Sequence, residues 1–534
     1  MRWESNRGTN ACLTPGGAVG ALLAAAIALP VAVLLTSGLE RQDLGVGASY
    51  VLRVLAFTLL QAGLSTVLSI LFAIPVALAL HRRRFFGRDL LLRLFAVTLG
   101  IPQLVAVLGL LSLYGKQGLA NTVLSGFGLP ALPPVYGLGG IVLAHVFFNM
   151  PFAARLALAA LESVPPENWR VAASLGFGTR DLFRHVEWPF LRMALPGMAF
   201  LVFMLCATSF TIVLTLGGGP QNNTLEVAIY QALRFDFDPP TAAWLAGLQI
   251  LICGGLLWAA RGFSTDIPLA ARTAQRRTGA HSPTDPATRL IDGALLAIAA
   301  AFVLLPLLMV AVDGLASDLP TLLSGAELWR AVATSLVVSL CAGLFAAAAA
   351  GSMAAAVARG RGICAGTLNS AGRLVLLVPP VIVAAGWFLL LYRYLDPARL
   401  APLAVIAINA LMALPFVMPL LVPAVRQSIE THDRLAASLG MRGWARFRLA
   451  DWPGLRRPFG LALLVGMLVS IGDFGAVAFF GSEGFVTLPL MLYQRLGSYR
   501  IADAAGLALV LLVFCLLLSA FIDRAARPEA PNVR

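Results

Sequence analysis

Charge is scarce in this sequence, and lysine is nearly absent. Charged residues make up only 12% of the 534 residues, whereas soluble domains carry about 25%, and Lys116 is the single lysine. Hydrophobic residues make up 59% of the chain, and the apolar runs repeatedly exceed the roughly 18–20 residues that cross a bilayer. The composition therefore excludes a soluble multidomain protein and predicts an all-α polytopic membrane protein.

Motifs for catalysis and metal binding are also missing. The lone lysine lies in Tyr-Gly-Lys-Gln with no serine or threonine after it, so the chain has no GxxxxGK[ST] phosphate-binding loop. HExxH and GxSxG motifs do not occur, and the six cysteines include no CxxC pair. We therefore expect no enzymatic activity, no catalytic residue, no bound cofactor and no metal site in the chain itself.

The charge that is present comes mainly from arginine, in short segments beside apolar runs. The net charge is +13, and the segments 81–93 and 261–289 contain five arginines each. The arginine-rich segments fall on one side of a twelve-span topology, together with both chain termini, and the positive-inside rule makes that side cytoplasmic. Because little of the chain lies outside the spans, this pattern favours topology and contact with anionic lipid over nucleic-acid binding.

We expect about twelve membrane-spanning helices in this chain. Several contain proline or glycine, which membrane helices tolerate because neighbouring groups satisfy the freed carbonyls. The expected spans cover about 17–37, 55–80, 94–115, 137–162, 192–216, 242–260, 290–312, 331–357, 374–392, 401–425, 457–480 and 502–522.

A polar, arginine-rich stretch occurs twice. Residues 170–189 read RVAASLGFGTRDLFRHVEWP and residues 434–453 read RLAASLGMRGWARFRLADWP, with ten of the twenty positions identical. The match extends over 137–189 and 401–453 at a constant offset of 264 residues. We therefore expect two homologous six-helix halves related by an axis along the membrane normal. The expected bounds are 1–260 and 290–534, with a hydrophilic cytoplasmic linker at 261–289.

Each copy of this stretch predicts a short exposed helix, a turn and a second helix. Gly176 and Gly440 can adopt the positive φ that ends a helix, and Pro189 and Pro453 follow thirteen residues later and lead into the next span. An ordinary surface loop would explain one copy, but not the same spacing in both, because loops diverge faster than spans. The two repeat segments, candidate docking loops for a partner, are residues 165–190 and 429–454.

The spacing of alanine, glycine and proline resembles the cytoplasmic EAA loop of ATP-binding-cassette importer permeases. The matching positions are Ala172, Gly176, Pro189, Ala436, Gly440 and Pro453. Arg170 and Arg434 stand where that family usually has glutamate. The resemblance implies a type I importer permease fold (MetI-like) in a bacterial inner membrane. It also implies loops that couple to two copies of a separate cytoplasmic ATPase holding ATP and Mg²⁺, and a periplasmic substrate-binding protein on the outer side.

Longer stretches narrow this resemblance. Permeases of this length with two fused halves include the ferric-iron and thiamine importers, and several stretches resemble the permeases for thiamine and thiamine pyrophosphate. These stretches are 82–94, 110–119, 143–156, 185–192, 216–233 and 470–481. The resemblance implies import of thiamine and its phosphates, with a ferric-iron permease as the alternative.

Polar residues within the apolar spans are candidates for a translocation path. They are Asp473, Ser209, His145, Asn149 and Asn409. Asp473 either faces the interface between the halves and helps a cationic substrate to pass, or makes a hydrogen bond between helices. Ser209 is its counterpart in the first half, and bonding between helices is the favoured interpretation for the other three. An ion-driven secondary transporter would also have two parallel halves, but it would need several coupled intramembrane carboxylates.

Overall fold

The computed structural model describes residues 14–38, 47–260, 286–360, 366, 368, 378–394, 396–441 and 443–526. Within these residues the secondary structure is helical and contains no β-strand, as the composition predicts. Most of the expected linker at 261–289, both chain termini and the start of the ninth expected span lie outside the described residues.

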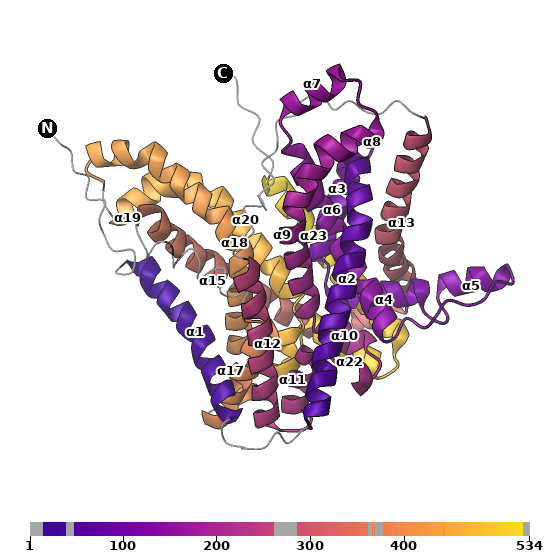
Figure 1. The fold of residues 1–534 in the computed structure, drawn as a ribbon. Coiled ribbons are helices and arrows are strands. Elements are labelled where there is room, and N and C mark those ends of the chain that lie inside the picture. Colours follow the sequence, from indigo (N-terminus) through magenta and orange to yellow (C-terminus); the bar gives the residue numbers. More distant parts are fainter. Residues whose placement is uncertain are drawn as a thin grey trace.

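The first half alternates long helices with short ones (Figure 1). Its elements are α1 (Pro15–Ser37), α2 (Ala48–Arg82), α3 (Arg88–Val97), η3 (Thr98–Gly100), α4 (Gln103–Tyr114), α5 (Leu119–Gly126), α6 (Leu138–Glu162), α7 (Pro166–Ser174), α8 (Thr179–Leu182), η4 (Phe183–Glu187), α9 (Trp188–Ala207), α10 (Thr211–Leu216), η5 (Pro220–Asn222), α11 (Leu225–Arg234) and α12 (Pro239–Ala260).

The second half follows a similar order. Its elements are α13 (Pro286–Ala316), α14 (Leu319–Ser324), α15 (Ala326–Arg359), α17 (Pro380–Tyr394), α18 (Pro397–Ser438), α19 (Gly443–Arg446), η6 (Phe447–Asp451), α20 (Trp452–Ile471), α21 (Gly475–Phe480), α22 (Leu488–Gly497) and α23 (Ile501–Ala526).

Ten helices among the described residues are long and apolar enough to cross a membrane. They correspond to ten of the twelve expected spans, and the shorter apolar helix α17 overlaps the ninth. The third expected span, 94–115, is wrong as a single helix, because the chain bends at Ile101 and Pro102 between η3 and α4. Proline disfavours a helical backbone in the residue before it, and Ile101 is accordingly extended (φ −81°, ψ 131°).

The fifth and eleventh spans also break before their expected ends. Helices α9 and α20 stop early, and the short helices α10 and α21 follow after a bend. In the second bend the Asp473 carboxylate accepts backbone hydrogen bonds from Gly475 and Ala476, both at 3.2 Å. A side chain that bonds to nearby backbone competes with the helical pattern. The expectation of continuous helices over 192–216 and 457–480 is therefore wrong.

The first helix of each half packs against the other half. Helix α1 lies along α17 and α15, whereas α13 lies along α4 and α2. Both crossings bring a proline carbonyl against a glycine, since a Cβ added to Gly109 would overlap Pro306 and a Cβ added to Gly386 would overlap Pro30. Only glycine leaves room for such an approach. Matching glycine–proline contacts thus hold the two halves together.

Two matching groups of three helices position the repeat segments. Helix α2 packs along α6 and α9, and α15 packs along α18 and α20. The first repeat segment connects α6 to α9, and the second connects α18 to α20. Each repeat segment is therefore attached at both ends to long, packed helices. In Figure 1, α7 and α8 lie at the upper right of the molecule and α19 at the upper left.

Candidate functional site

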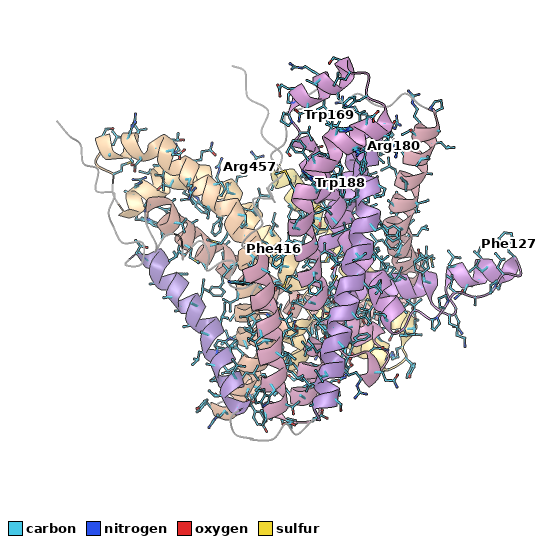
Figure 2. The ribbon with its side chains drawn as sticks, viewed as in Figure 1. Phe127, Trp169, Arg180, Trp188, Phe416 and Arg457 are labelled. Carbon is cyan, nitrogen blue, oxygen red and sulfur yellow. The ribbon has the colours of Figure 1, made fainter. Side chains whose placement is uncertain are left out.

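The first repeat segment is formed by α7, α8 and the π-helical turn η4. Helix α6 ends before Pro165 and Pro166, which cannot donate the backbone hydrogen bonds that would continue it. Pro166 then begins α7. Ala172 is buried beneath the segment in a small apolar cluster with Trp169. Figure 2 shows Trp169 and Arg180 at this end of the molecule.

The turn after α7 has the same geometry as the turn after α18. Gly176 has φ +67° and Gly440 has φ +66°, as expected for glycines that end a helix. In each turn the residue after the glycine donates its N–H to a carbonyl five residues earlier, that of Ala172 at 3.0 Å or Ala436 at 2.9 Å. The glycine N–H bonds three residues back, at 3.1 Å in both copies. This is the Schellman motif, in which a left-handed residue closes the helix end.

The second repeat segment has no separate helix before its glycine. Helix α18 runs without interruption over Pro397–Ser438, so the expected helix–turn–helix is wrong for the start of this copy. Ile429 and Glu430 stand where the first copy has its two prolines, and both can donate the hydrogen bonds of a continuing helix. The glycine turn of this half therefore lies at the end of a long spanning helix.

A π-helical turn joins each repeat segment to the next span. These turns, η4 and η6, end two residues before Pro189 and Pro453. The span helices continue back through them, because the helix is unbroken over Thr179–Ala207 and over Gly443–Ile471. Proline has no backbone N–H to donate to the helix. The π-helical turn just before it has wider i→i+5 hydrogen bonds, which change the hydrogen-bond register at this point. The expected second short helix is thus part of the spanning helix.

Glu187 and Asp451, at equivalent positions in the two π-helical turns, are bound by arginines. The Glu187 side chain is 2% exposed and accepts two hydrogen bonds from Arg82, at 3.1 and 2.5 Å. Asp451 pairs with Arg446 at 3.4 Å and with Arg359 at 3.7 Å. Arg82 and Arg359 are the last residues of the matching helices α2 and α15. These ion pairs tie each repeat segment to the second long helix of its half.

The sequence analysis did not identify these buried acids. Glu187 and Asp451 each precede Trp-Pro in their copy of the repeat. An acidic residue at the same position of both copies was the sequence feature that could have identified them. Glu226 in α11 is a third buried acid that the sequence analysis did not identify; it is fully buried, with one oxygen 3.3 Å from Gln249 Nε2. The helical spacing of the apolar residues around Glu226 was the signal that α11 folds into the protein.

Each repeat segment exposes two large apolar side chains with an arginine beside them. We call these surfaces the repeat faces; their residues are Arg170, Val171 and Leu175, and Arg434, Leu435 and Leu439. The four apolar side chains are between 57% and 64% exposed. Ala172 and Ala436 point the other way and are each 1% exposed. Exposed apolar side chains four residues apart on a helix are typical of a protein-docking surface.

The breaks after α9 and α20 bring the two halves into contact. Phe210 and Phe474, at equivalent positions just after the breaks, stack with ring centroids 6.0 Å apart and 15° between their planes. Tyr230 packs against Phe210 at 5.2 Å, and Tyr493 packs against Phe474 at 4.8 Å. We call these four rings the interface aromatic cluster. Because each half contributes two rings, the cluster lies at the contact between the halves.

Asp473 and Ser209 immediately precede the two stacked phenylalanines. The Asp473 carboxylate accepts hydrogen bonds from backbone N–H groups of its own bend, and neither of these two bonds joins two separate spanning helices. Ser209 is 3% exposed, and its hydroxyl has no hydrogen-bond partner among the described residues. The structure therefore brings both residues beside the interface aromatic cluster.

The other three polar candidates bond between helices within one half. His145 Nδ1 lies 3.1 Å from Ser65 Oγ, Asn149 Nδ2 lies 3.2 Å from Cys206 Sγ, and Asn409 Nδ2 donates to Ser470 Oγ at 2.9 Å. These contacts join α6 to α2, α6 to α9, and α18 to α20. They have the geometry expected of polar groups that hold membrane helices together.

Known membrane permeases are similar to this sequence over most of its length. A scan against protein-family models finds no match. A thiamine transport system permease protein from Brucella abortus is 48% identical over 488 residues, which cover 90% of this chain and 89% of the relative. The chain belongs to the thiamine transport system permease family. A family member from Escherichia coli is 44% identical over 481 residues, with 89% of each chain covered.

Membership of the thiamine permease family makes the chain a multi-pass inner-membrane transport permease rather than an enzyme. A probable molybdenum ABC transporter permease from Haloferax volcanii is 28% identical over 194 residues, 36% of this chain and 70% of the relative. The helical architecture and these relatives agree with a type I importer permease (MetI-like) fold. They favour a thiamine permease over the ferric-iron alternative and over an ion-driven secondary transporter.

Proposed function

We propose that this chain is the permease subunit of an ATP-driven importer for thiamine and its phosphates. The two repeat faces carry this proposal, because each presents an apolar and basic surface beside the same glycine turn. The chain has no phosphate-binding loop of its own, so a separate cytoplasmic ATPase would bind ATP and Mg²⁺. One ATPase copy would dock at each repeat face. The substrate is inferred from the relatives, whose names specify thiamine transport.

The repeat faces would lie on the cytoplasmic side of the membrane. Three consecutive arginines, at 82–84, lie at and just after the end of α2, beside the first repeat segment, and the positive-inside rule supports a cytoplasmic location for this end. Both chain termini and the linker at 261–289 would lie on the same side. A periplasmic binding protein would then deliver substrate to the opposite side. Two homologous halves, with bounds at 1–260 and 290–534, would move against each other during transport.

Movement of the ATPase would reach the interface aromatic cluster through long helices. Each repeat segment continues into α9 or α20 and is tied by an ion pair to α2 or α15. The far ends of α9 and α20 lie just before Phe210 and Phe474. Closure of the ATPase dimer would rock the halves and separate the two stacked rings. This requires the ATPase to bind one state of the permease more tightly than the other.

Purification of the chain together with its partners tests the proposed function. We expect two ATPase subunits for each copy of the chain, measured by native mass spectrometry of the complex. After reconstitution with a binding protein, the complex should accumulate labelled thiamine only when ATP is present. Recovery of the chain without any ATPase, or uptake of labelled ferric iron in place of thiamine, would contradict the proposal.

Replacement of both Phe210 and Phe474 with alanine is expected to increase passive leak through the complex. An aromatic pair contributes roughly 0.5–1.5 kcal/mol beyond its burial, so loss of the stacked pair should raise the leak by up to about tenfold. The leak is measured as efflux of labelled thiamine from proteoliposomes without ATP. Phe302→Ala is the matched control, because Phe302 packs on Phe147 outside the cluster. An unchanged leak in the double variant would show that this cluster does not block the substrate path.

A further inference from the structure

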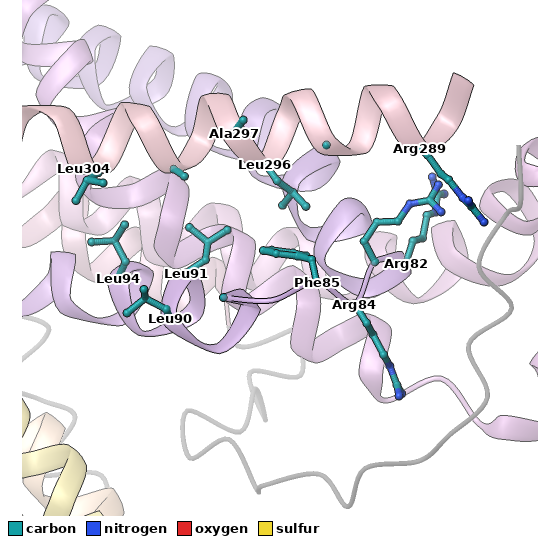
Figure 3. A pocket seen from close by; sticks show the side chains of 14 residues that line it. Arg82, Arg84, Phe85, Leu90, Leu91, Leu94, Arg289, Leu296, Ala297 and Leu304 are labelled. Atoms are coloured by element: carbon teal, nitrogen blue, oxygen red, sulfur yellow. The ribbon is translucent and has the colours of Figure 1, made fainter. Parts of the chain in front are cut away.

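A groove of about 990 Å³ lies between α3 and α13, away from the interface aromatic cluster (Figure 3). Leu90, Leu91 and Leu94 of α3 line one wall. The other wall is formed by α13, through Arg289, Gly293, Leu296, Ala297, Ala300 and Leu304. These α13 residues recur at helical spacings of three and four and so share one face. The groove therefore lies where the first helix of the second half meets the first half.

Four arginines gather at one end of this groove. They are Arg82, Arg83, Arg84 and Arg289. Figure 3 shows Arg82 and Arg289 together at that end, beyond Phe85, whereas the Arg84 side chain extends away from them. Two carboxylates offset part of this charge, because Glu187 pairs with Arg82 at 2.5 Å and Asp292 pairs with Arg83 at 2.6 Å. Four arginines against two carboxylates leave a charge of +2 at the mouth.

Arg84 and Arg289 carry the charge that is not offset. Both side chains are exposed, and neither makes an ion pair or a side-chain hydrogen bond with another described residue. Exposed guanidinium groups at the edge of a membrane are well placed to bind phosphate, which they recognise with two parallel N–H donors. The mouth of the groove is therefore suited to an anionic phosphate group.

The rest of the groove is apolar and long enough to cross one leaflet of a bilayer. Leu90 is 71% exposed and Leu304 is 42% exposed. The segment from Arg289 to Leu304 spans about 22 Å of helix, whereas half of a bilayer's hydrocarbon core is about 15 Å. A Cβ added to Gly293 would have no atom within 4 Å, so the wall is open there. A free phosphate ion would leave this apolar wall uncovered.

We propose that the groove binds an anionic phospholipid from the leaflet nearest the repeat faces. Its phosphate would lie at the mouth of the groove between Arg84 and Arg289, and an acyl chain would follow the leucines of α3 and α13. Basic sites between spanning helices on the cytoplasmic side attract anionic headgroups, and the buried acyl chain gains the hydrophobic contribution. Because Arg82 also holds Glu187 of η4, a bound lipid lies beside the first repeat segment. The proposal depends on neither the transported substrate nor the ATPase.

Native mass spectrometry of the purified full chain tests this site. Phosphatidylglycerol and phosphatidylcholine with identical acyl chains are titrated separately, and we expect tight retention of phosphatidylglycerol alone. Removal of one arginine near a membrane surface weakens binding about fivefold, so Arg84→Gln with Arg289→Gln should weaken it about 25-fold. Arg330→Gln with Arg399→Gln removes the same charge from exposed positions near the starts of α15 and α18, far along these helices from the repeat segment. This control should retain the lipid.

A second variant tests the apolar wall without changing the charge. Gly293→Leu fills open space in the groove and replaces a poor helix former in α13 with a good one, so it should exclude the acyl chain and lower retention of phosphatidylglycerol. Equal retention of the two lipids by the unmodified chain would overturn the proposal. Equal binding of phosphatidylglycerol by the two double-arginine variants would also overturn the proposal. Unchanged binding by Gly293→Leu, with displacement of lipid by glycerol phosphate, would indicate a site for free anions instead.

Discussion

Valine at both Gly176 and Gly440 is expected to abolish ATP-driven uptake and to leave the spanning helices folded. The two glycines have φ +67° and +66°, where a β-branched residue is a strong outlier. A left-handed conformation costs an L-residue about 1–2 kcal/mol, so each Schellman turn should open and displace its repeat face. No atom lies within 4 Å of a Cβ at either position, so crowding does not contribute. Uptake of labelled thiamine by proteoliposomes measures the effect.

Two further substitutions separate the geometry of the turn from the loss of glycine. Asparagine tolerates the left-handed conformation, so Gly176→Asn with Gly440→Asn should retain most of the uptake. Gly178→Val is a matched control in the same loop, because its φ of −75° suits valine and the nearest atom to a Cβ there is 4.0 Å away. Full uptake by the double valine variant, or equal losses with asparagine and valine, would show that the turn is not used in coupling.

Glu187→Gln is expected to separate ATP hydrolysis from transport and to destabilise the first half. Removal of one partner from a buried ion pair costs roughly 3–5 kcal/mol, because Arg82, 11% exposed, is left without its carboxylate. Hydrolysis should continue in the separate ATPase, whereas the tie between η4 and α2 is lost. The ratio of thiamine imported to ATP hydrolysed should fall, and so should the midpoint of thermal unfolding.

The equivalent change in the second half, Asp451→Asn, should have a smaller effect. Arg359 is 51% exposed, and Arg446 keeps a second partner in Asp433 at 2.7 Å. Only the pair with the exposed Arg359 resembles a surface ion pair, which contributes about 0–1 kcal/mol, and neither arginine is left buried without a carboxylate. For Glu187→Gln, a double-mutant cycle with Arg82→Gln supplies the control. If the two residues are coupled, the double variant loses less stability than the sum of the two single variants. If Glu187→Gln leaves the transport ratio unchanged, the ion pair is structural and has no part in coupling.

The turns of the repeat segments were accessible to sequence analysis because they depend on local backbone preferences. Proline at 165 and 166 ends α6, and glycine at 176 and 440 takes the left-handed conformation within its own turn. These effects act over a few residues, so a short stretch of sequence contains the information. The same reasoning explains the difference between the copies, since Ile429 and Glu430 allow α18 to continue.

Helix continuity inside the apolar spans was harder to predict. Hydropathy measures how well a segment suits lipid, and a bend between two apolar helices has nearly the same hydropathy as one unbroken helix. The breaks before Phe210 and Phe474 were therefore missed, as was the bend at Pro102 in the third expected span. Asp473 consequently lies in a bend with backbone partners, where an apolar spanning helix was expected.

By itself, the sequence determined a helical membrane protein with a repeated polar segment, glycine turns of fixed geometry and no phosphate-binding loop. Those properties follow from composition and from interactions between near neighbours in the chain. Only the tertiary structure decided that Arg82 reaches Glu187, 105 residues away, and that Phe210 stacks on Phe474 across the two halves. Contacts of this kind depend on how long helices pack, and packing combines many weak contributions from residues distant in the sequence.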